Sequence, residues 1–189
     1  MLRHRQLALA GALIVGLAPG CSTPEPGVGL SDRERTAIAD SIRGLLTETY
    51  VFDGSDPVPR FMKLYADTGR VVSAASGGFT ESRDSVRHAL ATFWNNVGQH
   101  MQQPVWQWGT MVVDVLSRDA VVVTARYTIP HWTPEKHPHV LGGVWTSVWT
   151  HRSGRWVIVD EHLSDLPRAI AERVEANMPA EPPPPTTRK

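Results

Sequence analysis

The residues best suited to chemistry in this sequence lie in its last apolar stretch. Asp160 and His162 lie near the end of residues 155–163, an apolar run after a Ser153–Gly154 turn that predicts a β-strand. Because successive side chains point to opposite faces of a strand, Asp160 and His162 should share one face and Glu161 should take the other. A carboxylate beside an imidazole raises the pKa of the histidine and orients its ring, which suits acid–base catalysis. The alternative is a hydrogen-bonded pair that closes a pocket floor or supports a dimer face.

A second group of polar candidates lies in a proline-rich segment, residues 131–139, which we expect to be a loop between two strands. It contains His131, Trp132, His137 and His139. Imidazoles together with Asp160 would be adequate zinc ligands, but their spacing matches no standard zinc signature. We therefore predict no metal site, and we expect residues 133–136 to be a solvated connection.

Aromatic residues are the third group of candidates, because the chain has seven tryptophans. An aromatic-lined pocket would bind a flat or apolar ligand. Tyr65 is a candidate to donate a hydrogen bond into such a pocket, beside Asp160 and His162. Packing in the core and the sheet explains most of the tryptophans equally well, and one aromatic face could form a homodimer interface. The residues predicted to bind ligand are Phe61, Trp94, His131, Trp132 and Trp145.

The elements that would position these residues follow a simple order. Ser31 and Glu34 form a capping box at the start of a helix that runs to about Thr49. A shorter helix follows the Asp56–Pro57 break, a short strand covers residues 70–74, and a third helix begins after Ser82. Strands are then expected over residues 106–116, 120–129, 141–151 and 155–163, followed by a closing helix.

Helices followed by a long antiparallel meander predict an α+β fold. We expect a cone-shaped, strongly curved antiparallel sheet packed against the N-terminal helices. Long strands with aromatics on alternate positions tend to curl, and a helix pair across one face would leave a cone that is open at one end. Such a cone encloses a pocket.

Composition limits what this domain can bind. The 189-residue chain has a formal net charge of zero, so it lacks the basic excess that binds nucleic acid. It contains no P-loop, no dinucleotide-binding glycine motif and no G-x-S-x-G, and therefore no cofactor is predicted. One cysteine cannot form an internal disulfide, so packing alone must hold the fold.

The N-terminal residues predict an export signal. Arg3 and Arg5 precede an apolar run over residues 7–18, which is too short to span a bilayer. Residues 17–21 resemble a bacterial lipobox ending in Cys21. We expect lipid on Cys21 to anchor the chain to a membrane of the cell envelope, outside the cytoplasm; the alternative is a plain signal peptide with an incidental cysteine.

The chain therefore divides into four predicted parts. Residues 1–20 are the signal peptide and residues 21–30 are a flexible tether rich in proline and glycine. Residues 31–178 form the α+β domain. Residues 179–189, with four consecutive prolines, are predicted to be a disordered tail.

The closing strands carry a family resemblance. Residues 143–150, the turn at Ser153–Gly154 and the run Glu161-His162-Leu163-Ser164 resemble the last hairpin of SnoaL-like proteins, in the nuclear transport factor 2-like superfamily. Residues 61–72 and the helix after Glu81 also fit. The sequence departs from the family pattern at Asp160, where many relatives have a histidine, and over residues 131–139, which are longer than a simple turn.

The resemblance implies a conical pocket but leaves two functions open, because one fold serves many activities. In the first, the domain binds a small apolar or aromatic molecule without turnover. In the second, it resembles the family's isomerases, cyclases and dehydratases, with Asp160 and His162 as base and orienting group and Tyr65 polarising a carbonyl.

Overall fold

The computed structural model describes residues 29–183 and begins with a capped helix, α1 (Asp32–Thr49). The backbone N–H of Glu34 donates to Ser31 Oγ at 3.3 Å, and the backbone N–H of Ser31 donates to Glu34 Oε2 at 2.8 Å. These two contacts confirm the predicted capping box. Ile42 and Leu46 project from α1 into the core, where neither is exposed.

Short elements connect α1 to the main sheet. The chain passes through α2 (Val58–Phe61), a 3₁₀ turn η1 (Met62–Leu64) and the strands β1 (Val72–Ala75) and β2 (Gly78–Thr80). Helix α3 (Arg83–Asn96) and a second 3₁₀ turn, η2 (Gly98–His100), follow. The Ser82 side chain accepts a hydrogen bond from Ser85 N, so it caps α3 as predicted.

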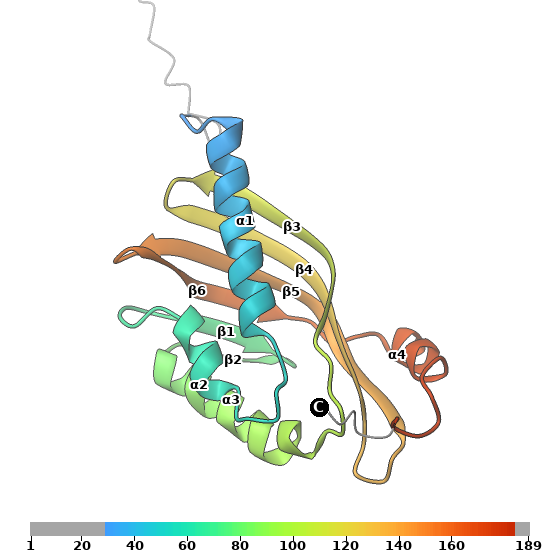
Figure 1. Cartoon of the computed structure of the whole chain (residues 1–189). Helices are drawn as coiled ribbons and strands as arrows, with labels where there is room; N and C mark the ends of the chain where they lie inside the picture. The colour runs from blue at the N-terminus through green and yellow to red at the C-terminus, as the bar shows by residue number, and fades with distance from the viewer. Residues whose placement is uncertain (1–28, 184–189) are drawn as a thin grey trace, which may run out of the picture.

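Four long strands make up most of the sheet: β3 (Gln107–Ser117), β4 (Ala120–Trp132), β5 (Pro138–Arg152) and β6 (Arg155–Leu163). The strand order is β2-β1-β6-β5-β4-β3. All neighbours are antiparallel except β1 and β6, which run parallel and pair Ser73 with Glu161. Helix α4 (Arg168–Glu175), the last element of the chain, packs against β5. The α+β prediction is thereby confirmed (Figure 1).

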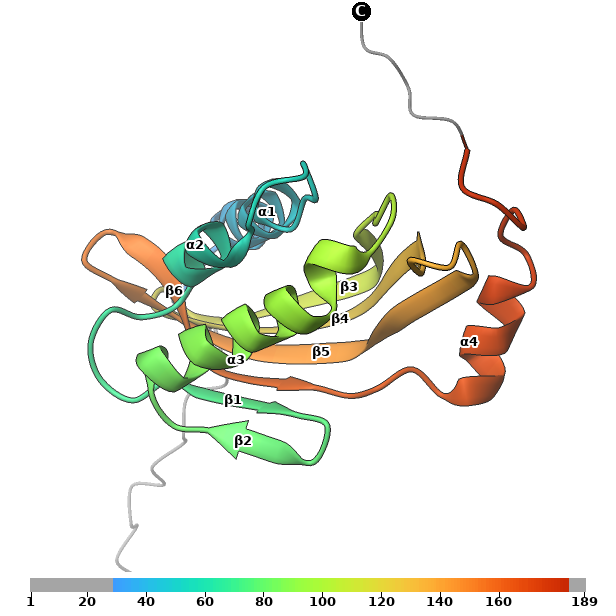
Figure 2. The ribbon, with the colours of Figure 1, turned by 90° about the horizontal axis from the view of Figure 1, so that it is seen from below.

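The helices α1, α2 and α3 lie on one side of the sheet, and the sheet curves around them (Figure 2). Register shifts in β3 and between β5 and β6 contribute to this curvature, because a bulge bends a strand and increases its twist. The main core lies between the sheet and the helices. Its members include Ile42, Leu46, Met62, Val86, Val121, Val123, Trp149 and Ile158.

The predicted loop at residues 131–139 is wrong, because most of these residues belong to strands. β4 continues to Trp132 and β5 begins at Pro138, with His131 opposite His139. Pro138 takes the first position of β5, where a strand tolerates proline. Only residues 133–137 connect the two strands.

The predicted signal peptide, Cys21 and most of the predicted tether lie outside the described residues. No helix within residues 29–183 combines the length and the apolar character needed to cross a membrane. At the other end, the first part of the predicted tail contacts the domain. Pro179 O accepts a hydrogen bond from Trp132 Nε1 at 3.0 Å, and Pro183 O accepts one from Gln103 Nε2 at 2.6 Å.

Candidate functional site

A cavity of about 530 Å³ lies on the side of the sheet that the helices cover. The loop after α1, the helices α2, α3 and α4, and the strands β1, β4, β5 and β6 all contribute side chains to it. Most of these side chains are apolar, and many are aromatic. The aromatic residues of the lining are Tyr50, Phe52, Phe61, Tyr65, Phe93, Trp94, Trp106, Tyr127 and Trp145.

The aromatic rings form a continuous wall centred on Tyr50. Its ring centroid lies 4.6 Å from that of Phe61, 4.5 Å from that of Trp106 and 5.8 Å from that of Trp145. Trp106 stacks on Tyr127 with centroids 5.1 Å apart and an angle of 12° between the rings. These spacings are those of favourable aromatic pairs. The indole N–H of Trp106 is buried without a hydrogen-bond partner among the described residues, which leaves one donor unsatisfied in this wall.

Glu161 is the buried charged group of the cavity, with only 4% of its surface exposed. Tyr65 OH and Ser73 Oγ both donate to its Oε1 atom at 2.7 Å, and Trp145 Nε1 donates to Oε2 at 2.9 Å. Ser73 reaches the carboxylate because parallel pairing sets it beside Glu161. The carboxylate is thus held in one position by donors from three different segments.

The burial of Glu161 changes its ionisation. Loss of hydration raises the pKa of the Glu161 carboxyl, and the hydrogen bonds from Ser73, Tyr65 and Trp145 oppose that rise. Burial also raises the pKa of Tyr65 well above its ordinary value, and the negative charge of Glu161 adds to the effect. Tyr65 therefore remains a neutral hydrogen-bond donor.

Glu161 faces the cavity because β6 contains one extra residue. Trp149 pairs with Ile158, whereas Val148 pairs with Asp160, so Val159 has no partner in β5. This bulge shifts the alternation of side chains by one residue. Glu161 and Leu163 therefore point inward on the same side as Ile158, and Asp160 and His162 point outward. Strict alternation would instead have placed Asp160 and His162 on the side of Ile158.

The prediction that Asp160 and His162 face the pocket is therefore wrong. Both side chains are exposed, and neither contributes to the cavity lining. Asp160 pairs across the sheet with Val148 and His162 with Thr146. Their shared face is the outer face of the sheet, so the acid–base pair inferred from spacing is not at the site.

The other predicted residues divide into two groups. Tyr65, Phe61, Trp94 and Trp145 line the cavity, so the structure brings these four together. His131 and Trp132 do not line it. They are buried at the far end of the β4–β5 hairpin, where His131 Nε2 lies 3.1 Å from Nδ1 of His139.

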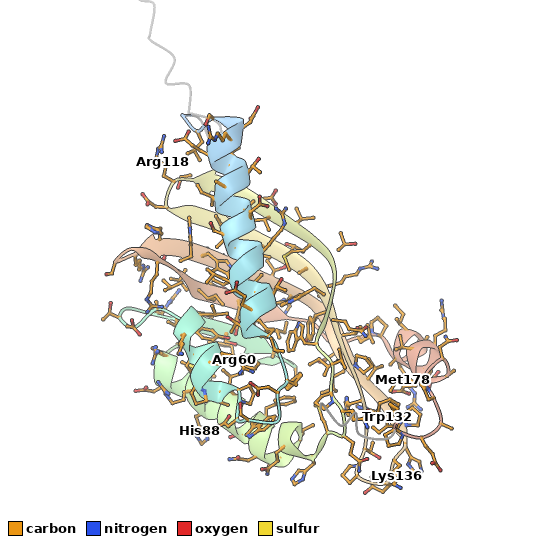
Figure 3. The ribbon with its side chains drawn as sticks, viewed as in Figure 1. Arg60, His88, Arg118, Trp132, Lys136 and Met178 are labelled. Atoms are coloured by element: carbon orange, nitrogen blue, oxygen red, sulfur yellow. The ribbon has the colours of Figure 1, made fainter. Side chains whose placement is uncertain are left out.

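That end of the hairpin is a separate structural region. Trp132 lies near Lys136 and Met178 in Figure 3, far from Arg118 at the opposite end of the sheet. The pKa of His131 is lowered, chiefly by burial. Among residues 29–183, no three His, Cys, Asp or Glu side chains come together in a way that could hold a metal ion.

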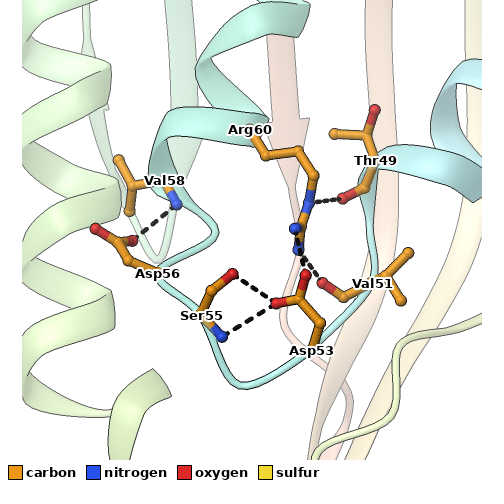
Figure 4. A network of polar contacts seen from close by, with 7 residues as sticks. All are labelled: Thr49, Val51, Asp53, Ser55, Asp56, Val58 and Arg60. Carbon is orange, nitrogen blue, oxygen red and sulfur yellow. Dashed lines mark hydrogen bonds and ion pairs between the residues drawn. The ribbon is translucent and has the colours of Figure 1, made fainter.

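A polar network fixes the loop that carries Tyr50 and Phe52 into the cavity (Figure 4). Arg60 Nε donates to Thr49 O at 2.9 Å, and its Nη2 donates to Val51 O. Arg60 Nη1 also contacts Asp53 Oδ2 at 2.9 Å. The hydrogen bonds that Ser55 donates, and then Arg60, lower the pKa of Asp53 to about 2. One arginine thus holds the loop between α1 and α2 in place.

The opposite wall depends on a close approach between β5 and the chain after β6. A Cβ atom on Gly143 would lie 1.8 Å from Ser164 O, so glycine is required for this contact. The approach lets the chain turn toward α4. Asp165, Leu166 and Ala171 then complete the cavity lining on that side.

Sequence reasoning missed Glu161, Tyr50, Trp106 and Tyr127 as members of the site. Glu161 belongs to the very motif that suggested the family, but alternation had assigned it to the opposite face. The apolar run over residues 156–159, just before the acidic pair, does not alternate with polar residues and is therefore a sign that strict alternation does not hold here. The missed aromatic residues come from three segments, the loop after α1, the chain before β3 and strand β4, which only the tertiary fold unites.

Comparisons with known proteins agree with this architecture. No protein-family model matches the sequence, and no curated protein matches it. Among solved structures, a candidate scytalone dehydratase from Novosphingobium aromaticivorans DSM 12444 superposes with a TM-score of 0.60 at 14% identity, covering 72% of this chain and 89% of the other. The chain has the nuclear transport factor 2-like fold.

Two further structures of this fold are similar to the chain, one of them an enzyme and the other a protein of unknown function. A hexachlorocyclohexane dehydrochlorinase (LinA) Type2 gives a TM-score of 0.53 at 16% identity and covers 73% of this chain and 95% of its own. A nuclear transport factor 2-like protein of unknown function from Shewanella oneidensis MR-1 gives 0.51 at 21% identity, covering 67% and 98%. At these identities the similarity supports the fold and leaves the activity open.

Proposed function

We propose that this domain binds a small, largely apolar or aromatic molecule in its cavity. The observation that carries the proposal is the pairing of a continuous aromatic wall with one fixed polar group, Glu161. Ligand sites are typically concave and apolar with a few placed polar atoms, and a cavity of about 530 Å³ is in the usual size range. The unsatisfied Trp106 N–H offers a further donor in the wall.

A variant that fills the cavity tests this proposal. Ala89 on α3 lines the cavity and is exposed, so Ala89→Trp should obstruct the site without disturbing the core. His88→Trp is the matched control, because His88 is exposed on the same helix and does not line the cavity (Figure 3). Steroids, polycyclic aromatics and lipids would be screened by thermal shift and isothermal titration.

The expected result is that at least one compound class raises Tm in the wild type and in His88→Trp but not in Ala89→Trp. Binding that persists unchanged in Ala89→Trp would place the ligand elsewhere. Failure of every class to shift Tm would count against a ligand site of this kind.

A second candidate function is acid–base catalysis, with Glu161 in the role first given to Asp160 and His162. The position of Glu161 in the cavity wall favours it, and burial raises the pKa of this carboxyl group above its ordinary value, which makes it a stronger base than an exposed glutamate. Tyr65 would orient that carboxyl group. Hydrogen–deuterium exchange at carbon atoms next to a carbonyl, followed by NMR on a panel of cyclic ketones in D₂O, would detect such chemistry without knowledge of the natural substrate.

In this second function, Glu161→Gln should abolish the exchange, and Asp160→Asn should leave it unchanged. Exchange that survives in Glu161→Gln would rule out Glu161 as the base. A complete absence of exchange in the wild type would leave binding as the function of the cavity.

Membrane attachment through Cys21 is proposed alongside these functions, from the lipobox-like sequence alone. Stable anchoring generally needs two lipid chains, which a diacylated cysteine supplies. Cys21→Ser should move the protein from the membrane fraction to the soluble envelope fraction. Retention of the variant in membranes would refute the lipid anchor.

A homodimer through the sheet is the remaining proposal about partners. Val112, Leu116 and Val144 are large hydrophobic residues of the sheet that stay between 37% and 48% exposed. Val144→Asp should convert a dimer to a monomer in light scattering after size exclusion, whereas Lys136→Asp, on the β4–β5 connection, should not. A wild type that is monomeric at high concentration would overturn this proposal.

A further inference from the structure

The charged groups of the cavity are of one sign. Its lining contains Glu161 and Asp165, and no lysine, arginine or histidine of residues 29–183 belongs to it. Arg83 at the start of α3 and Arg155 at the start of β6 both pair with Asp67, which lies outside the lining. A cavity with apolar walls and charges of one sign concentrates the opposite charge.

The hydrogen bonds to Glu161 come from neutral groups. Tyr65, Ser73 and Trp145 provide three donors, and within the described part of the chain no basic side chain pairs with the carboxylate. A buried carboxylate without a positive partner is costly, and hydrogen bonds from neutral donors compensate that cost only in part. The site is therefore electrostatically incomplete when Glu161 is ionised.

Both acids influence the same part of the cavity. Burial raises the pKa of Tyr127 to about 12, and the negative charges of Asp165 and Glu161 contribute to this rise. Tyr127 stacks on Trp106, so the two carboxylates and the aromatic wall lie in one electrostatic environment. Aromatic faces carry a negative quadrupole that attracts organic cations, most strongly when the site is desolvated.

We propose that the cavity selects an organic cation, a substituted ammonium with an aromatic or alkyl body. Its charge is neutralised by Glu161, and the faces of Tyr50, Trp106 and Trp145 add a cation–π attraction. This inference rests on the proposed ligand-binding function and narrows the class of ligand. The ammonium group would complete the site at Glu161, and the apolar body would fill the remaining space.

A pair of probes that differ only in charge tests the inference. Benzyltrimethylammonium and neopentylbenzene have nearly the same shape, because a quaternary nitrogen in the first replaces a quaternary carbon in the second. Their affinities would be measured for the wild type, Glu161→Gln and Asp160→Asn at pH 8. Asp160→Asn removes a carboxylate one residue away that lies on the outer face of the sheet.

The wild type should bind the cation at least tenfold more tightly than the neutral probe. Glu161→Gln should weaken cation binding about tenfold and change neutral binding by less than twofold, and Asp160→Asn should change neither. Because the cation prefers the ionised carboxylate, its affinity should rise with pH, whereas that of the neutral probe should stay constant.

The outcomes separate this inference from the proposed function. If the neutral probe binds as tightly as the cation, or if Glu161→Gln binds the cation normally, the cation inference is wrong. In that case, loss of neutral binding in Ala89→Trp would still support the ligand site. If neither probe binds up to millimolar concentration, this result counts against the cation inference and the ligand site alike.

Discussion

The two faces of β6 carry similar acidic residues in opposite environments. On the inner face, Glu161 is buried and accepts hydrogen bonds from three segments of the chain. On the outer face, Asp160 and His162 are exposed, one residue away on either side. A single bulge at Val159 decides which of these groups enters the cavity. The comparison shows that register, rather than residue type, assigns the chemistry of this strand.

Exchange of Glu161 and His162 should break the comparison most strongly. Glu161→His together with His162→Glu keeps the composition but places an imidazole inside the cavity wall and a carboxylate on the outer face. A neutral imidazole can accept only one of the three hydrogen bonds that the Glu161 carboxylate accepts, so two buried donors would lose their acceptor. The free energy of unfolding should fall by roughly 3 kcal/mol, which chemical denaturation measures. Exchange of Asp160 and His162, both on the outer face, is the control, and an equal loss in the two double variants would contradict the special environment of Glu161.

Trp145→Phe should have the next largest effect, because it keeps an aromatic ring but removes the N–H that donates to Glu161 Oε2. Loss of one donor to a buried charged acceptor should cost about 2 kcal/mol. Trp156→Phe, on the same hairpin and outside the cavity lining, should cost clearly less. Equal losses in the two variants would mean that the hydrogen bond to Glu161 contributes little.

The pH dependence of stability sharpens the comparison further. The folded protein holds the Glu161 proton more tightly than the unfolded chain, because burial raises the pKa above its ordinary value of 4.5. Stability contributed by this proton is present below pH 4.5 and is lost as pH rises through the folded pKa. Each unit of raised pKa corresponds to about 1.4 kcal/mol.

Glu161→Gln cannot ionise at this position, so it should not lose stability when the wild-type carboxyl group deprotonates. The free energy of unfolding of the variant relative to that of the wild type should therefore increase as pH rises above 4.5. Urea titrations at several pH values measure the trend. A difference that is constant with pH would show that Glu161 has no raised pKa in the folded protein.

The smallest effects are expected on the outer face. Asp160→Asn and His162→Asn change exposed side chains that form no hydrogen bond with any other side chain of residues 29–183, so each should alter the free energy of unfolding by less than about 0.5 kcal/mol. Ligand binding should be unchanged as well. A strong loss of binding in His162→Asn would return the outer face to consideration as a functional surface.

Much of the fold could be predicted because local signals mark it. The capping box at Ser31 and Glu34 and the N-cap at Ser82 specify where α1 and α3 begin. The turns around Arg118 and Gly154 separate long apolar strands. These features depend on residues that are near one another in the sequence, so the sequence alone contains the information.

The site was harder to predict because its geometry depends on distant contacts. The bulge at Val159 is defined by pairing with β5, and the prolines around His131 and Trp132 suggested a loop where tertiary pairing extends two strands. The short strand β2 was also missed. Tyr65 and Trp145 were identified as site residues, but their shared partner, Glu161, appears only once β1, β5 and β6 lie side by side.

The indole N–H signals of the tryptophans provide the most direct test of a ligand site in the cavity. A two-dimensional ¹⁵N NMR titration with benzyltrimethylammonium, or with any compound found by the thermal-shift screen, reports each tryptophan separately. The signals of Trp94, Trp106 and Trp145, which line the cavity, should shift with one common dissociation constant. Those of Trp132 and Trp156, outside the lining, should remain in place. Shifts confined to Trp132 or Trp156 would contradict a ligand site in this cavity.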